Sequence, residues 1–368
     1  MIWRSRLVLL LAALAPGVLH AYIEFPYAAG FQTIRMPLLP RGSEPWKKGD
    51  MEIQFSAGWM NVWSIQSNRF ILDGEEVRLN AGLSWGLSNR LRVGIVAPYV
   101  IQGGGILDRT IERFHSATLV TQGHRQEFPR NKFNVSYEPL GPYYPILQQL
   151  ERVIESSYLP RKYPRSDIDP PVAYLPDPET SAFLGYDLDW FPEDSLDART
   201  RSGPGALRIY ADYRLPISSD YFEAMVFSVQ GASEGSSATV AGNTGRSLSF
   251  STLIRSEKKV HSYYWAAGLS YAMFEDRKFR LLELPAQQWA FRPRLGYLME
   301  DAEIFGEYVF YSSPVKNWGK LSAAGHEIAL GVSTELGSYS LEIAVIENFI
   351  TYSTTPDVGF YASLRRQL

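Results

Sequence analysis

The sequence contains no cysteine, and it has no long apolar run beyond its first residues. With no cysteine among its 368 residues, the chain can form no disulfide framework and carry no lipid anchor through cysteine. After Leu19, no apolar run approaches the roughly 18–20 residues that a membrane-spanning helix requires. The net charge of −3 is too small for a global field that would attract nucleic acid. If the chain enters a membrane, only a closed β-barrel can satisfy its backbone hydrogen bonds.

The first residues have the organisation of a secretory signal peptide, which we assign to residues 1–21. A basic start is followed by an apolar core and a cleavage site that ends in alanine. Residues 22–48 are interrupted by proline and glycine and show no period, which predicts an N-terminal periplasmic segment. We interpret residues 49–368 as a barrel domain in the outer membrane.

A hairpin over residues 77–99 shows the pattern that organises the rest of the chain. Its odd positions are apolar on both sides of a short turn at residues 88–90, and its even positions are mostly polar, charged or glycine. Alternation with period two predicts β-strands. A strand of about ten residues with one apolar face is the unit of a transmembrane β-barrel.

The same alternation recurs along the chain and predicts an all-β fold. We expect a transmembrane antiparallel up-and-down barrel of about twelve strands, in which an even count returns both termini to the periplasm. Aromatic residues make up 14% of the chain, and tyrosine and tryptophan suit the bilayer interface. A soluble β-sandwich also alternates apolar and polar residues, but it does not need strands this long or loops of two lengths.

A large loop over residues 102–203 interrupts the alternation, and we expect it on the extracellular side. Apolar residues fall at helical spacing in two places, near residues 107–118 and 146–154. Prolines between and after them predict helices joined by extended segments. Because each helix would have an apolar stripe to bury, we expect the loop to dock on the barrel mouth or to fold into the lumen as a plug or lid.

The last strand indicates how the barrel would be assembled. Residues Asp357–Leu364 place a glycine and alternating apolar residues as in the terminal strand of outer-membrane barrels, although the chain ends in leucine and not in an aromatic residue. We therefore expect the barrel-assembly machinery as a partner of this strand. The other expected partners are outer-membrane lipid, lipopolysaccharide and a small-molecule solute, and nucleic acid is not expected.

Three stretches of the chain resemble an uncharacterised proteobacterial outer-membrane family known as domain of unknown function 3187. They are Gly103–His115, Gly123–Asn131 and Glu347–Phe360. The resemblance spans most of the mature chain, with the proline-rich residues 139–200 as an insertion, and it implies an outer-membrane barrel without a known activity. The turn Leu87–Leu91 is also similar to turns of solute-channel barrels linked to the uptake of aromatic compounds, a likeness generic to up-and-down barrels.

If the apolar sets face lipid, the alternate residues face the lumen, and many of them are ionisable. Ionisable side chains at membrane depth must face water or each other. They could line a pore that selects solutes, or they could form a self-neutralising network that fills a narrow barrel. The size of a twelve-stranded barrel does not decide between the two readings. The pore-lining candidates are Glu52, Glu76, Arg78, Arg92, Arg208, Asp212, Arg292, Arg294, Glu303, Glu307 and Glu342.

The large loop supplies a second group of candidates, which could form a ligand or metal site at the barrel mouth or could only hold a plug helix by hydrogen bonds. Zinc sites need three or four ligands at defined spacing, and an acidic cluster at residues 187–197 lacks the spacing of a calcium loop. We therefore expect no metal and no cofactor. The loop candidates are Asp108, Glu112, His115, His124, Arg125 and Arg130.

These observations lead to a non-enzymatic outer-membrane barrel that acts as a passive channel or uptake protein for small solutes, with the large loop as plug or lid. The alternative is a closed structural barrel that binds a partner or a surface lipid through its outer loop. A lipid-modifying enzyme would need a Ser–His pair. In His261–Ser262, the two side chains point to opposite faces of one strand, so we expect no catalytic residues.

Overall fold

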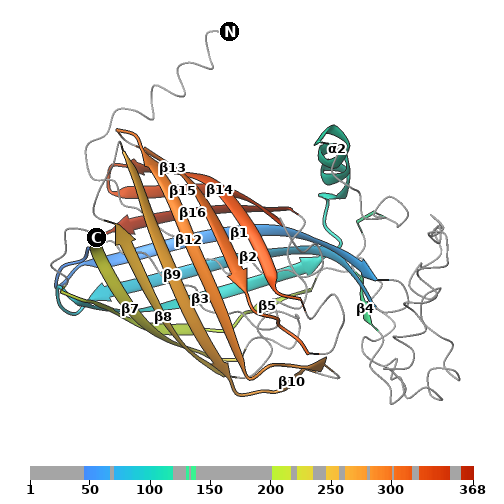
Figure 1. Cartoon of the computed structure of the whole chain (residues 1–368), viewed down its shortest axis with the longest axis horizontal. Helices are drawn as coiled ribbons and strands as arrows, with labels where there is room; N and C mark the ends of the chain where they lie inside the picture. Colours follow the sequence, from blue (N-terminus) through green and yellow to red (C-terminus); the bar gives the residue numbers. More distant parts are fainter. Residues whose placement is uncertain are drawn as a thin grey trace, which may run out of the picture.

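In the computed structural model, the chain forms one antiparallel barrel with a helix beside one end (Figure 1). The predicted signal peptide and most of the predicted periplasmic segment lie outside the described residues. So do the expected helix near residues 146–154 and the acidic cluster. The structure describes residues 45–66, 70–118, 130–131, 134–137, 201–216, 222–234, 246–256, 262–279, 282–300, 302–316, 323–348 and 358–368.

Twelve long strands build the wall of the barrel. They are β1 (Met51–Gln66), β2 (Phe70–Gly86), β3 (Leu91–Gly103), β6 (Arg208–Arg214), β7 (Phe222–Ala232), β8 (Ser247–Ser256), β9 (Tyr263–Phe274), β12 (Gln287–Leu298), β13 (Ala302–Tyr311), β14 (Gly325–Leu336), β15 (Tyr339–Asn348) and β16 (Val358–Gln367). The other elements are the helix α2 (Asp108–Thr118) and the short strands β4 (Asn134–Tyr137), β5 (Arg201–Pro204), β10 (Lys278–Phe279) and β11 (Leu282–Glu283). The helix α2 lies where the sequence predicts one.

The sheet closes on itself, and each wall strand pairs with the one before and the one after it. The first strand, β1, pairs with β2 and also with the last strand, β16, and β3 pairs with both β2 and β6. All pairings are antiparallel. The short strands β4 and β5 add to the ends of β2 and β3 that point toward the large loop. The prediction of a closed, antiparallel barrel of about twelve strands is therefore confirmed.

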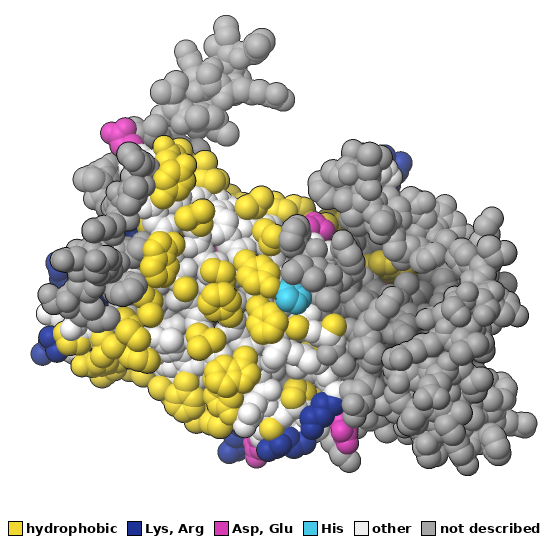
Figure 2. Space-filling view, in the orientation of Figure 1, with side chains coloured by type: hydrophobic (Ala, Val, Ile, Leu, Met, Phe, Trp, Pro, Cys, Tyr) yellow, Lys and Arg dark blue, Asp and Glu magenta, His cyan; other side chains and the backbone are white. Residues whose placement is uncertain are grey.

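The alternation seen in the sequence separates the two faces of the wall. On β14 the outward Leu330 is 64% exposed, and the inward Ala329 beside it is fully buried. The predicted hairpin behaves in the same way, with Leu79, Leu83 and Trp85 exposed on the outer face. Figure 2 shows the result as apolar side chains spread over the barrel wall. A band of apolar side chains around a closed barrel is the surface that a bilayer covers.

Connections at the two ends of the barrel differ in length. At one end, which we call the turn end, β2 and β3 are joined through residues 87–90, and β14 and β15 through residues 337–338. The start of β1 and the end of β16 lie at this end too, where the Leu368 N–H donates to the Met51 carbonyl. Most longer connections, including residues 104–207, lie at the other end, which we call the loop end. This asymmetry is typical of outer-membrane barrels.

Two glycines on the inner face make room for tyrosine rings from neighbouring strands. A Cβ atom on Gly94 would lie 2.3 Å from the Tyr210 hydroxyl oxygen, and one on Gly296 would lie 2.1 Å from the Tyr264 ring. These glycines let large side chains lie flat against the wall, so they help to fill the interior. Among the described residues, no helix is long and apolar enough to cross a membrane.

Candidate functional site in the barrel lumen

Every pore-lining candidate lies on the inner face of the wall. All of them are buried except Glu52, which is half-buried at the turn end. The inner face also carries ionisable residues that the sequence analysis did not single out, namely Arg255, Glu327 and Arg365. All three follow the same alternation, so the sequence contained the signal.

The densest group of charges lies on β12 and β13. Arg292 Nε is 2.5 Å from Glu307 Oε1, and Arg294 Nη2 is 2.8 Å from Glu303 Oε1. Arg294 Nη1 also lies 3.6 Å from Glu342 Oε2 on β15. These residues come from β12, β13 and β15, with β14 between the last two. The register of an antiparallel sheet sets the inward side chains of adjacent strands beside each other. We call Arg292, Arg294, Glu303, Glu307 and Glu342 the charge layer.

Aromatic rings enclose the charge layer. The Tyr264 hydroxyl donates a hydrogen bond to Glu303, and the Arg294 guanidinium carbon lies 3.6 Å from the centre of the Phe305 ring. The Arg255 guanidinium carbon lies 4.8 Å from the centre of the Tyr264 ring. Ion pairs packed against rings in this way are shielded from water, so each charge depends on its partner for stabilisation.

A second set of polar contacts lies across the lumen on β2, β3 and β6. Arg92 donates from Nε and Nη2 to Asp212 Oδ2 at 3.1 and 2.8 Å. Arg78 forms an ion pair with Glu76, which also accepts a 2.7 Å hydrogen bond from Gln102. The polar side chains on this side of the lumen are thus held by partners on the same or adjacent strands.

One part of the lumen is apolar. Met60 of β1, Val309 of β13, Ala344 and Ile346 of β15 and Tyr361 of β16 belong to one cluster of buried side chains. The charge layer and this cluster both lie on the inner face of the wall, on strands β12–β16 and β1. Barrels narrower than the sixteen-stranded porins can be filled by side chains in this way.

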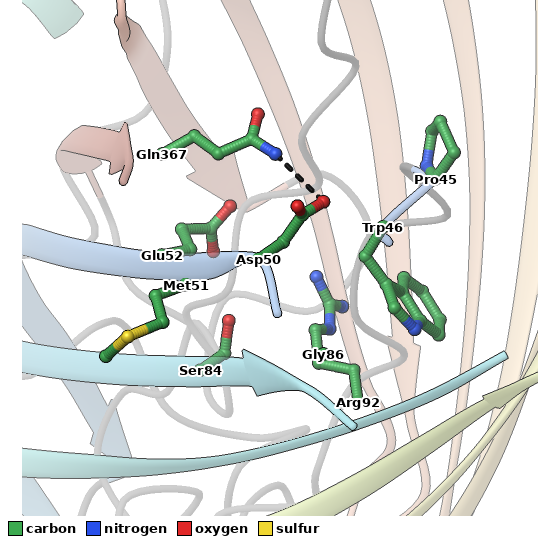
Figure 3. Close-up of a pocket in the computed structure, with 9 residues that line it drawn as sticks. All are labelled: Pro45, Trp46, Asp50, Met51, Glu52, Ser84, Gly86, Arg92 and Gln367. Atoms are coloured by element: carbon green, nitrogen blue, oxygen red, sulfur yellow. Dashed lines mark hydrogen bonds between the residues drawn. The ribbon is translucent and has the colours of Figure 1, made fainter. Parts of the chain in front are cut away.

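The segment before β1 packs a tryptophan against the turn end of the barrel. Trp46 is 6% exposed, and the Arg92 guanidinium carbon lies 4.6 Å from its ring centre. The Gly49 N–H donates to the Gly86 carbonyl, and Gln367 donates to Asp50 Oδ2 at 3.1 Å. Figure 3 shows Trp46, Asp50, Gly86, Arg92 and Gln367 around a small pocket, with Arg92 beside Trp46. The sequence analysis did not anticipate that Trp46 is buried at the end of the barrel, whereas residues 47–49 beside it are exposed.

The helix α2 lies beside the wall and not in the lumen. Leu107 and Ile111 pack against Val358 of β16 and Trp59 of β1, and the register places Trp59 and Val358 on the outer face. Figure 1 shows α2 outside the ribbon of the barrel near the loop end of β1 and β2. The expectation that this part of the loop docks on the mouth or enters the lumen is therefore wrong for α2. The helix lies outside the wall because polar side chains at the loop end of the outer face hold it there.

Glu75 of β2 is the main anchor of α2. Its Oε2 accepts a 2.7 Å hydrogen bond from Trp59 Nε1, and its Oε1 accepts from the backbone N–H groups of Ile106 and Leu107. Gly105 has φ +64°, and a Cβ atom there would lie 1.8 Å from the Glu75 carboxyl carbon. This contact gives a physical reason for the glycine-rich stretch before the helix.

The loop candidates stabilise the same region. Asp108 accepts from Asn61 Nδ2 at 3.3 Å and from the Asn131 backbone at 2.7 Å. Glu112 accepts two hydrogen bonds from Arg130, and this contact raises the pKa of the Arg130 guanidinium. His124, Arg125 and the side chain of His115 lie outside the described residues. Within the described part, no three histidine, cysteine or acidic side chains come together as a metal site.

His326 lies on the outer face, where its Nδ1 is 2.5 Å from the Tyr308 hydroxyl and its ring packs against Phe310. Among the described residues no serine hydrogen-bonds to it. The Ser–His arrangement of an acyl-transfer site is therefore not formed at this histidine. His261 lies outside the described residues.

A family model matches residues 5–142 and 193–368, which is most of the chain. Its description reads "Protein of unknown function (DUF3187)". The chain belongs to this family. The family model does not cover residues 143–192, within the segment read as an insertion, and the resemblance noted in the sequence is confirmed.

Comparison with curated proteins gives no match. Among solved structures, the chain is similar to the toluene transporter TodX of Pseudomonas putida, with 10% identity, coverage of 93% of this chain and 98% of that chain, and a TM-score of 0.35. It is also similar to the translocator domain of the autotransporter NalP from Neisseria meningitidis, at 7% identity, 88% and 90% coverage, and a TM-score of 0.38. A third is the CymD monoaromatic hydrocarbon channel, at 9% identity, 88% and 89% coverage, and a TM-score of 0.38. Likenesses this distant do not identify a solute.

Proposed function

We propose that the protein is an outer-membrane barrel that passes small polar solutes through its lumen and is closed in the conformation described here. The observation that carries the proposal is the inner face, where arginines and carboxylates are present in nearly equal numbers along the barrel. Ionisable residues at membrane depth are costly, and they commonly mark the path of an ion or a polar solute.

A barrel that only needed a filled interior could use apolar side chains. The chain does this in the cluster around Met60 and Tyr361. Elsewhere it places buried ion pairs, whose desolvation commonly costs as much as their attraction returns. We therefore interpret the charge layer as a closed gate, since its ion pairs can separate and be hydrated if the lumen opens.

Three features support a location in the outer membrane: the apolar band, the closed sheet, and the difference between short connections at one end and long ones at the other. The turn end would then face the periplasm and the loop end the outside. The acyl-transfer arrangement is not formed at His326, and we propose no enzymatic activity.

Conductance of the purified protein in a planar bilayer tests the gate. We expect low, rare openings for the wild type and larger or more frequent openings for Arg294→Ala, because this change removes the cation that holds Glu303 and Glu342 together. The matched control is Leu295→Ala, which lies next in the same strand on the outer face. No conductance in the wild type and in Arg294→Ala, with both folded, would contradict a channel.

The large loop is proposed as a lid, although its helix α2 rests on the outer wall. The segment that could cover the lumen is then the part between β4 and β5. Replacing residues 138–200 by a short glycine–serine linker should raise conductance without unfolding the barrel, because the wall strands remain intact. Unchanged conductance together with native mobility on gels would show that this part of the loop is not a lid.

A closed structural barrel is the second candidate. It is favoured by the nearly complete burial of the inner charges and by Trp46 at the turn end. Under this reading the charge layer only stiffens the wall, and the exposed loops bind a partner or a surface lipid. Absence of conductance in every variant that folds would favour it over the channel.

A further inference from the structure

Within the part of the chain that the structure describes, Glu327 differs from the paired carboxylates of the lumen because no cation forms an ion pair with it. It lies on the inner face of β14 and is 0% exposed. Among the described residues, neither of its carboxylate oxygens accepts a hydrogen bond, whereas Glu303 and Glu307 each bind an arginine. An ionised carboxylate buried without a partner is among the costliest groups in a protein.

A second polar side chain without a partner lies directly beside it. Asn348 of β15 is the register partner of Glu327, and it is 4% exposed. Within the described part, its Nδ2 and Oδ1 atoms make no hydrogen bond. Residues directly opposite in an antiparallel pair project to the same face with Cβ atoms about 4.5–5.5 Å apart. The two side chains therefore present three oxygen acceptors to one place.

The described neighbours of Glu327 do not supply the missing charge. On β13 the residue opposite Glu327 is Val309, with Glu307 and Tyr311 as the next inward residues. On β12 the inward cation at about this level is Arg292, whose Nε is bound to Glu307 at 2.5 Å. The other neighbours along β14 and β15, Ala329 and Ile346, are apolar and fully buried.

We propose that Glu327 and Asn348 form a binding site for a singly charged cation in the half of the lumen nearer the loop end. The carboxylate supplies the opposite charge and two oxygens, and Asn348 Oδ1 supplies a third. Oxygen acceptors suit an alkali cation, and they also suit an ammonium group, which donates hydrogen bonds to them. One carboxylate carries one negative charge and the amide is neutral, so the site balances one positive charge. This inference deepens the proposed function, because it names cations as the class of solute.

The position of the site suits a binding step in the passage of a cation through the lumen. β14 begins at Gly325, directly after the connection at the loop end, so Glu327 is the first inward acidic residue of that strand. Arg292 of the charge layer lies at about the level of Glu327, and the other four residues of the layer lie further along the lumen toward the turn end, where β12 and β13 are joined through residues 299–301. A cation that enters from the loop end would meet Glu327 before it meets those four residues.

Thermal unfolding of the purified protein in detergent tests the site without requiring conductance. The probes are sodium, potassium, ammonium and methylammonium chlorides, each compared with tetraethylammonium chloride at equal ionic strength and pH. For the wild type, we expect at least one small cation to raise the unfolding temperature in a saturable way. Glu327→Gln should lose this rise. Glu342→Gln, which removes another buried carboxylate that lies near Arg294, should retain it.

A response to ammonium and methylammonium alone would indicate a solute that carries an amine. A response to sodium or potassium would indicate an inorganic ion. Asn348→Asp adds a second carboxylate at the site and should enlarge the rise, which keeps the test usable if Glu327→Gln does not fold. An equal rise in Glu327→Gln and wild type, or no rise with any small cation, would overturn the site. Binding without conductance would leave the site standing and contradict the channel.

Discussion

Single charges inside the barrel depend on specific partners. The ion pair of Arg92 with Asp212 is an example, because Asp212 is fully buried and Arg92 also stacks on Trp46. At a buried pair the loss of one partner leaves an uncompensated charge, which costs more than the pair itself contributes. Such residues can be tested one at a time.

Changing Arg92 to Met should therefore destabilise the barrel by about 3–5 kcal/mol, because it removes the cation that pairs with the buried Asp212 carboxylate. The double variant Arg92→Met with Asp212→Leu should recover most of this loss, since the buried carboxylate is also removed. The measurement is the free energy of unfolding in urea, for protein folded into lipid vesicles. Equal destabilisation in the single and double variants would show that the packing of Arg92 on Trp46, and not the ion pair, is what matters.

At the scale of one element, the position of α2 follows from a few polar residues on the outer wall. The helix has an apolar stripe, and the stripe could have been buried against the mouth, the lumen or the wall. Glu75 decides between them, because its carboxylate binds the backbone at the start of the helix and the Trp59 indole. The helix is thus attached to the loop end of the wall from outside.

Glu75→Ala should release α2 and leave the barrel folded. The variant loses the acceptor for Trp59 Nε1 and for two backbone N–H groups, each worth about 1 kcal/mol or more when the acceptor is a carboxylate. We expect faster hydrogen exchange and faster proteolysis within residues 106–118. Leu79→Ala is the matched control, because Leu79 lies on the outer face of the same strand and is 43% exposed. Equal rates in wild type and Glu75→Ala would show that other contacts hold the helix.

The whole molecule is defined by its two faces. Outward positions form one apolar band around the barrel, and inward positions form a polar and partly apolar filling. This division is reversed relative to a soluble protein, and it is stable only when the outer band is covered by a solvent as apolar as lipid. The folded barrel is therefore stable only where lipid covers its outer band.

Arg in place of Val332, an outward residue near the middle of β14, should cost about 2–4 kcal/mol in a bilayer. Val332→Leu should cost little, because it keeps an apolar side chain on the same face. We expect the wild type in the outer-membrane fraction, with a mobility on gels that changes on heating, and less folded Val332→Arg in that fraction. Recovery of the folded wild type from the soluble periplasm would contradict the membrane barrel.

The sequence by itself determined the barrel, its strand number and the orientation of each strand face. These features depend on alternation with period two, which is local and repeats along the chain. The sequence of each strand therefore shows which of its residues face outward and which face inward. The same rule placed every pore-lining candidate on the inner face, and it would also have placed Glu327 and Arg365 there.

Only the tertiary structure decided which side chains meet. Whether Arg294 pairs with Glu303 depends on the register between strands. The surroundings of Glu327 likewise depend on residues far along the chain, such as Asn348, which is 21 positions away. The site where α2 docks was equally hidden, because an apolar stripe shows that a helix must be buried but not against which surface. Long-range pairing supplies this information, and period and spacing do not contain it.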